Sequence, residues 1–394
     1  MSIRQSPPVT PTSAAETQAG YSHRSPTPPS ISSSKGSKGS PSASLQPPPL
    51  PYVRGAHFEI KPHNPPPTLD NGYGYHNPDP KEWNPNPWPF GDDAPKGIVA
   101  QYLAHPPRKP RDETPPKDQV KHDLVVTQQI RCGDDCLAQV VQCLVDGEER
   151  VAKIFDPLYV GIDRCNEYGF PPTYYSERFY SCEAAAYKRI EESGLDGRYT
   201  PKFYDCWFLE LPLPISKGNV VRREVCLILQ EFIPGDTIEA LTKHGEANKV
   251  PPDTRVELLD RLMEAICHLQ FIGVINDDKH PRNFMVAKDA KKGWQITLID
   301  FSHSRVRDLP NSLWWTRTRT QEQKRPESPM TILRHCWPPI CSGWIPEKCD
   351  CRTEASLRER LEHMEKRWGN SDEYEPVDRR KLNKYIDILR ERWL

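Results

Sequence analysis

Short runs of apolar residues predict β-strands in the part of the chain that follows residue 120. Residues 125–127, 136–141 and 150–155 are rich in β-branched and other apolar side chains. Asp146-Gly147 lies between the last two runs and is a typical hairpin turn. Residues 225–232 form a longer apolar run that ends at Pro234-Gly235, which predicts a buried strand followed by a turn.

Apolar residues at helical spacing predict two helices further along. Residues 176–190 place four residues on one face, with Ser176 as the expected N-cap and Gly194 as the expected end signal. These four residues are Phe179, Glu183, Tyr187 and Ile190. Residues 251–269 begin with two prolines and an aspartate and carry an apolar stripe. A carboxylate on the otherwise apolar face of the first helix needs a cation nearby, unless it reaches water at the boundary.

Two more amphipathic helices are predicted near the end of the chain, over residues 357–368 and 377–393. Between them and the preceding polar, basic stretch lie four cysteines. These are Cys336, Cys341, Cys349 and Cys351. A zinc site is one interpretation, but the spacing lacks a C-x-x-C pair, so buried structural cysteines are the other.

The first 118 residues differ in composition from the rest. They are rich in Pro, Ser and Thr and poor in aliphatic residues, which predicts a disordered tail over residues 1–118 and a folded domain over residues 119–394. Residues 52–90 interleave aromatic side chains with prolines. This portion can dock on the folded part or on a partner, or it can be a plain linker.

The global composition excludes few functions. The net charge of −1 gives no reason to expect nucleic-acid binding. No signal peptide or membrane-spanning run is seen, so we expect a cytoplasmic or nuclear protein that does not bind membranes, and a monomer. The twelve cysteines are expected to be reduced in such a compartment.

Candidate chemistry is concentrated in residues 273–305. An aspartate on a tight loop (Asp278) is followed by Asn283, a short strand, a turn and a second strand that ends at Asp300. Mg²⁺ takes one or two carboxylates together with substrate phosphate oxygens, and phosphoryl transfer needs a carboxylate to orient the attacking hydroxyl. The alternative is an Asp-rich surface turn, because Asp and Asn favour turns for local reasons.

This stretch resembles the catalytic loop and the metal-binding segment of the protein-kinase superfamily, H-R-D-x-x-x-x-N followed by D-F-G. Here the first triplet reads Asn276-Asp277-Asp278, the asparagine is Asn283, and the second triplet reads Asp300-Phe301-Ser302. The resemblance implies that Asp278 is the catalytic base and that Asn283 and Asp300 hold metal.

Other parts of that family's site follow in the expected order. Val151-Ala152-Lys153 resembles the V-A-I-K strand, which implies that Lys153 grips nucleotide phosphates and pairs with Glu183 of the predicted helix. The run that ends in Pro-Gly resembles the segment between the two kinase lobes. Backbone groups near Glu231 and Ile233 would then bind adenine.

The glycine-rich loop of the family is only partly present. The family pattern G-x-G-x-x-G-x-V aligns with Gly133 to Val140, which implies that Gly133 and Val140 contact the nucleotide. Gly133 is the only one of the three glycines that remains. Because backbone amides cradle phosphate best where no side chain blocks the approach, this departure weakens the expected grip on a nucleotide.

The resemblance implies an α+β, bilobal, protein-kinase-like fold with a β-sheet N-lobe (119–233) and a shortened helical C-lobe (234–394). It also implies ATP and Mg²⁺ as cofactors. Asp277 replaces the arginine that receives an activating phosphate, so phosphorylation of the segment after Ser302 is not expected to switch activity by that route. His280 and the short C-terminal part look more like the aminoglycoside and choline phosphotransferase branch.

Three functions therefore stay open. The favoured one is a protein-kinase-like enzyme that moves the γ-phosphate of ATP to an acceptor hydroxyl. The second is an enzyme with the same chemistry and a small-molecule acceptor. The third is a pseudokinase scaffold without catalysis, which the poor glycine loop favours.

Overall fold

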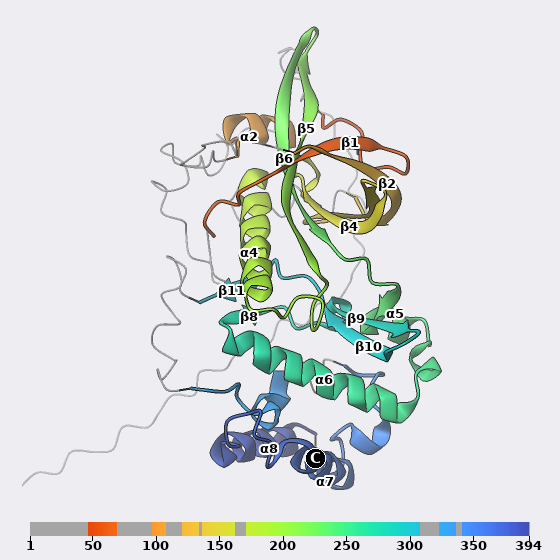
Figure 1. The fold of residues 1–394 in the computed structure, drawn as a ribbon, viewed down its shortest axis with the longest axis vertical. Coiled ribbons are helices and arrows are strands. Elements are labelled where there is room, and N and C mark those ends of the chain that lie inside the picture. Colours follow the sequence, from red (N-terminus) through yellow and green to blue (C-terminus); the bar gives the residue numbers. More distant parts are fainter. Residues whose placement is uncertain are drawn as a thin grey trace, which may run out of the picture. The chain divides into compact units, whose positions relative to one another are not determined.

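The computed structural model describes residues 46–68, 97–107, 120–133, 136–161, 171–307, 323–335 and 341–393. All of them belong to one compact unit, Ser44–Leu394. This part of the chain is α+β, with six α-helices and antiparallel sheets (Figure 1), so the predicted fold class is confirmed at this level.

Six strands form a closed antiparallel sheet in the order β1-β2-β3-β4-β6-β5. The strands are β1 (His57–Pro62), β2 (His122–Arg131), β3 (Gln139–Val145), β4 (Glu148–Phe155), β5 (Phe203–Ser216) and β6 (Asn219–Gln230). The predicted turn between β3 and β4 is confirmed, since Asp146 and Gly147 both have positive φ angles, of 49° and 86°. Such a turn matches the right-handed twist of the paired strands.

The closed sheet includes chain that was predicted to be disordered. β1 pairs with β2 and with β5, and Ile60 of β1 is completely buried among the apolar side chains of the sheet. Tyr52, just before β1, is buried in the same cluster. The prediction of a disordered segment through residue 118 is therefore wrong for residues 46–68 and 97–107. The prolines around β1 obscured its alternating apolar pattern in the sequence. The rest of the predicted tail lies outside the described residues.

Helix α4 (Pro172–Glu192) lies beside the closed sheet (Figure 1). It begins four residues before the predicted N-cap, because Pro172 occupies the first turn, where its missing N–H costs nothing. Ser176 is therefore a buried residue inside the helix, and its predicted role as the N-cap is wrong. Helix α2 (Ile98–Ala104) packs against α4 and against the 3₁₀ turn η1 (Pro157–Tyr159).

The second half of the chain contains the remaining helices and two small sheets, β10-β9-β7 and β11-β8. The helices are α5 (Ile238–Lys243), α6 (Pro252–Phe271), α7 (Glu354–Trp368) and α8 (Arg379–Trp393). The strands are β7 (Gly235–Thr237), β8 (Val274–Asn276), β9 (Phe284–Asp289), β10 (Gly293–Leu298) and β11 (Ser304–Val306). The 3₁₀ turns are η2 (Ala247–Lys249), η3 (Pro281–Asn283), η4 (Pro329–His335) and η5 (Glu347–Cys349).

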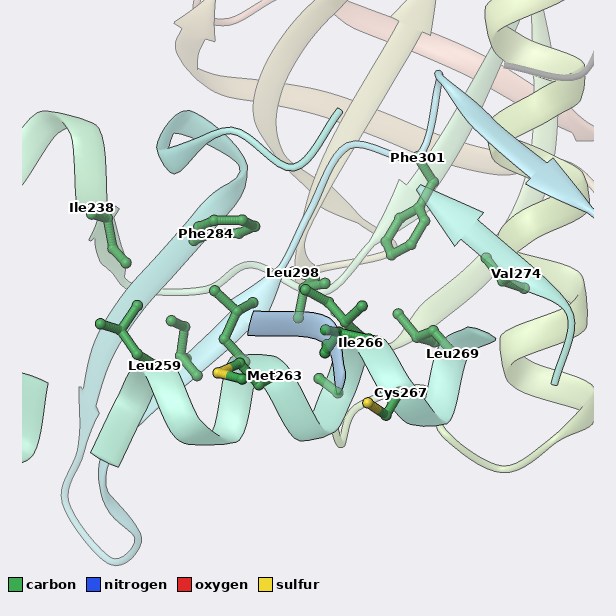
Figure 2. Close-up of a cluster of buried hydrophobic side chains, with 14 of the residues drawn as sticks. Ile238, Leu259, Met263, Ile266, Cys267, Leu269, Val274, Phe284, Leu298 and Phe301 are labelled. Atoms are coloured by element: carbon green, nitrogen blue, oxygen red, sulfur yellow. The ribbon is translucent and has the colours of Figure 1, made fainter. Parts of the chain in front are cut away.

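An apolar cluster joins α6 to the hairpin of β9 and β10 (Figure 2). Leu259, Met263 and Ile266 point from α6 toward Phe284 and Leu298 of the hairpin. Truncating one such buried side chain to alanine typically costs about 2–5 kcal/mol. The cluster therefore anchors β9, which begins directly after Asn283, and β10, which ends two residues before Asp300.

Charged side chains fix α7 against α6. Arg360 of α7 donates to Asp260 of α6 over 2.6 Å, and neither side chain is exposed to solvent. Arg367 of α7 donates to Glu257 and Glu264 over 2.6 and 2.8 Å. The two helices predicted at the end of the chain are thus present, and α7 is tied to α6 by ion pairs as well as by apolar contact.

None of the helices in the described part combines the length and the apolar character needed to span a lipid bilayer. None of the ten cysteines that the structure describes forms a disulfide bond with another described residue. Cys341, Cys349 and Cys351 are buried, while Cys336 lies outside the described residues.

Candidate functional site

Lys153 of β4 joins two carboxylates that are far apart in the sequence. Its ammonium donates to Glu183 Oε2 of α4 over 2.5 Å and to Asp300 Oδ1 over 2.7 Å. Val140 lies directly opposite Lys153 in the ladder between β3 and β4. The structure therefore brings four of the predicted site residues together.

The charges in this cluster depend on one another. Burial alone would lower the pKa of Lys153, but the carboxylates of Asp300 and Glu183 outweigh it and raise that pKa, so the ammonium stays charged. Burial raises the pKa of Glu183 to about 7, and the charge of Lys153 offsets only part of this effect. Burial also acts to raise the pKa of Asp300, yet the charge of Lys153 holds it well below its usual range.

Asp300 has a backbone conformation that is rare for its residue type, with φ at 60°. Its Oδ1 accepts from Lys153 and from both the hydroxyl and the N–H of Ser302, over 2.6 and 3.3 Å. Its Oδ2 accepts no hydrogen bond from the described residues, and 29% of the side chain is exposed. One carboxylate oxygen is thus fixed, and the other is available.

Asp278 and Asn283 lie side by side on the loop after β8. The Asn283 amide donates to the Asp278 backbone carbonyl over 2.9 Å and to Asp278 Oδ2 over 3.0 Å. Arg282 donates to the same Oδ2 over 2.6 Å. In the described chain, no hydrogen bond reaches Asp278 Oδ1 or Asn283 Oδ1, so each residue keeps one oxygen available.

Backbone contacts tie this loop to the Asp300 segment. The Asn276 side chain donates to the Asp300 carbonyl over 2.8 Å and accepts from the Asp278 N–H over 2.9 Å. The Ile299 N–H donates to the Asn283 carbonyl over 2.9 Å. These contacts hold the loop that carries Asp278 and Asn283 next to Asp300. The sequence predicted that these three side chains lie close together.

Asp277 forms an ion pair that the sequence did not indicate. Arg305 of β11 donates to Asp277 Oδ1 over 2.6 Å, and the Asp277 N–H donates to the His303 carbonyl over 3.2 Å. β8 and β11 pair next to this contact. The segment after Asp300 is therefore held to the Asp278 loop by the chain's own charges.

Glu231 and Ile233 follow the end of β6. The Glu231 N–H donates to the Lys202 carbonyl, and the Ile233 carbonyl accepts from the Gly235 N–H, both over 2.9 Å. Among the described residues, none bonds to the Glu231 carbonyl or to the Ile233 N–H. One acceptor and one donor are thus left along this segment.

The loop at Gly133 is closed by a side chain. Gln139 accepts from the Gly133 N–H over 2.8 Å and donates to the Gly133 carbonyl over 2.9 Å. Gly133 has φ at 144°, a conformation that favours glycine. Its N–H, expected to face a phosphate, already has a partner, and Asp134 and Asp135 lie outside the described residues.

Sequence reasoning missed three residues that shape the site: Asn276, Ser302 and Gln139. Asn276 and Gln139 act through backbone groups, whose positions exist only after folding. Ser302 stands where the family has glycine, and its hydroxyl bonds to Asp300. The sequence signal for Ser302 was the departure from the family motif itself.

No protein-family model and no curated protein matches the chain. Among solved structures, 1023 chains match. One is the crystal structure of BubR1 kinase domain, with 15% sequence identity and a TM-score of 0.32 over 47% of this chain and 48% of that one. The match thus spans about half the length of that structure. At this TM-score the similarity carries no argument for function, which the geometry of the site has to supply.

Proposed function

We propose that this protein is a phosphotransferase with a protein-kinase-like, bilobal fold that uses Mg-ATP to phosphorylate an acceptor hydroxyl on a protein or a small molecule. The observation that carries the proposal is the bridge from Lys153 to Glu183 and Asp300. Three distant segments place one ammonium between two carboxylates, with a third carboxylate on the neighbouring loop.

The proposed domain limits change at one end. We assign residues 119–233 to the N-lobe and residues 234–394 to the C-lobe, and we add β1 to the N-lobe because it pairs with two of that lobe's strands.

The oxygens that the fold leaves open fit a magnesium ion. Asp300 Oδ2 and Asn283 Oδ1 are hard oxygen donors beside the fixed ammonium. Among the described residues, no group of three or more His, Cys, Asp or Glu side chains is placed to hold a metal. Magnesium in phosphotransferases does not need one, because it takes one or two protein ligands and fills its shell with phosphate oxygens and water.

The open backbone groups fit a nucleotide base. The Glu231 carbonyl and the Ile233 N–H offer the acceptor and the donor that an adenine edge requires. Val140 supplies apolar contact close to Lys153. The third N–H of the Lys153 ammonium has no acceptor in the described chain and can donate to a phosphate oxygen. When bound, Mg-ATP supplies the phosphoryl group.

Asp278 is positioned to orient the acceptor. Its Oδ2 is held by Arg282 and Asn283, which fixes the carboxylate plane and leaves Oδ1 to accept the hydroxyl proton. Such positioning accounts for most of the protein's part in phosphoryl transfer. The exposed remainder of the Arg282 guanidinium adds positive charge beside this oxygen.

The test is a thermal-unfolding titration of the full chain with Mg-ATP and with metal-free ATP. We expect Mg-ATP to raise Tm, since a ligand at 100 times its Kd stabilises the folded state by about 2.7 kcal/mol. Metal-free ATP is expected to give a smaller shift. In Asp300→Asn the difference between the two titrations should disappear, because the open oxygen loses its charge.

The matched control is Asp289→Asn, which removes an exposed carboxylate at the end of β9. Within the described part of the chain, this carboxylate accepts hydrogen bonds from the backbone N–H groups of Lys291 and Lys292. The variant should respond to both ligands as the wild type does. Equal Tm shifts with and without magnesium in the wild type would refute the proposed metal site.

One observation favours a second function, that of a non-catalytic scaffold. Gln139 occupies both backbone groups of Gly133, so that loop offers a phosphate one donor fewer. On this alternative, neither form of ATP changes Tm. The variant Gln139→Ala separates the two, since an enzyme should bind Mg-ATP more tightly once the Gly133 N–H is free.

A further inference from the structure

Two N-terminal segments contact α4, the helix that carries Glu183. Residues 46–68 run along the closed sheet through β1, and α2 packs against α4. Neither segment belongs to the folded domain that the sequence predicted. Their contacts with α4 therefore belong to this chain and do not follow from the resemblance to the kinase superfamily.

The first contact is a hydrogen bond of 2.6 Å between His63 Nδ1 and the Tyr180 hydroxyl. The His63 N–H also donates to the Cys206 carbonyl of β5 over 2.9 Å, and its ring packs against Tyr180 and Phe208. His63 is thus fixed to the sheet by its backbone and to α4 by its ring.

The second contact lies at the start of α4. The Thr173 hydroxyl donates to the His105 carbonyl, just after α2, over 2.6 Å. Thr173 is completely buried. Two separate polar anchors therefore fix α4, one in its first turn and one in its middle.

Tyr180 is close to the site in both sequence and space. It precedes Glu183 by three residues, which is nearly one helical turn. Its ring also packs against Phe155, two residues after Lys153, with the ring centroids 5.6 Å apart. A shift of α4 at Tyr180 would thus change the distance of 2.5 Å between Lys153 and Glu183, and hydrogen bonds weaken steeply when stretched or misaligned.

We propose that His63 and Tyr180 are positioning residues through which the N-terminal segment sets α4, and with it Glu183, at its distance from Lys153. This inference rests on the proposed function for its effect on nucleotide binding. Its effect on α4 itself does not need a nucleotide.

The experiment compares two tyrosine variants of the full chain. Tyr180→Phe removes the hydroxyl that bonds to His63 and also to the Cys206 side chain. Tyr159→Phe removes the hydroxyl that donates to the Pro48 and Pro49 carbonyls over 2.9 and 3.1 Å. Each change removes one tyrosine hydroxyl that bonds to residues 46–68. Tyr159 differs from Tyr180 in lying in η1 and not in α4.

For Tyr180→Phe we expect faster amide hydrogen exchange across residues 176–187 without nucleotide and about fivefold weaker Mg-ATP binding, the factor that one hydrogen bond of about 1 kcal/mol represents. Tyr159→Phe should leave both quantities at the wild-type value. If α4 exchange is unchanged in Tyr180→Phe, or if Tyr159→Phe has the same effect, the inference is overturned.

A second pair of variants tests the partner residue. His63→Leu cannot hydrogen-bond to Tyr180 and should reproduce Tyr180→Phe, whereas a glutamine in His63→Gln can donate or accept and should restore slow exchange in α4. Equal exchange in the two His63 variants would contradict the inference. Should the wild type bind no Mg-ATP, the proposed function fails, and the exchange data alone decide this inference.

Discussion

Asp300 combines a strained backbone with a carboxylate whose two oxygens have different surroundings. A non-glycine residue at a φ of 60° costs free energy, and such residues gather at functional sites. The cost is offset here by bonds to one oxygen from Lys153 and Ser302. The sequence could propose the charged residues because their types and order resemble the kinase motif. The neutral residues that hold them were not, because their bonds go to backbone groups.

Asp278→Ala should abolish phosphoryl transfer and leave the Mg-ATP-dependent rise in Tm largely unchanged. The alanine cannot orient an acceptor hydroxyl, while the groups proposed to hold nucleotide and metal remain. The measurement is ATP turnover beside thermal unfolding. Turnover at the wild-type rate would remove Asp278 from the mechanism.

Among the elements, those with a clear period were predictable and those with mixed composition were not. α4 and α6 follow from their apolar faces, and the turn between β3 and β4 follows from Asp146-Gly147. β1 was missed because it is a six-residue strand in a proline-rich segment, and only its pairing with β2 and β5 stabilises it. Long-range pairing of this kind leaves no local signal in the sequence.

The segment after β1 gives the fold a pH dependence. Burial, with help from the charge of Lys188, lowers the pKa of His63 to about 4. Between this value and about 6.5 the unfolded chain binds more protons than the folded one, so stability rises with pH. We expect His63 to remove up to about 3 kcal/mol of stability as pH falls from about 6.5 to 4. Urea denaturation between these pH values should show a smaller loss of unfolding free energy in His63→Gln than in the wild type. An equal loss in both proteins would show that His63 does not cause this pH dependence.

Over the whole molecule, the sequence placed α7 and α8 but not their attachment. Helical periodicity assigns charged residues to a solvated face, yet Asp260 and Arg360 are both fully buried between α6 and α7. Their burial becomes predictable only when both helices are seen together. The packing of the other residues after Arg305 was equally unpredictable, because the resemblance to the kinase family fades there.

This buried pair predicts how strongly α7 is coupled to the rest of the fold. Asp260→Ala leaves the Arg360 guanidinium without its carboxylate and should lower the free energy of unfolding by about 3–5 kcal/mol. Asp253→Ala, in the first turn of the same helix, breaks an exposed pair with Lys348 and should cost no more than about 1 kcal/mol. Urea denaturation compares the two, and a similar loss in both would show that burial of the first pair is unimportant.

The ion pair between Asp277 and Arg305 affects whether phosphorylation of the neighbouring segment could regulate this protein. For a phosphate attached nearby, the Arg305 guanidinium is already paired with the carboxylate of Asp277, the residue next to Asp278 in the sequence. A phosphate on that segment would therefore gain little attraction from the Arg305 guanidinium.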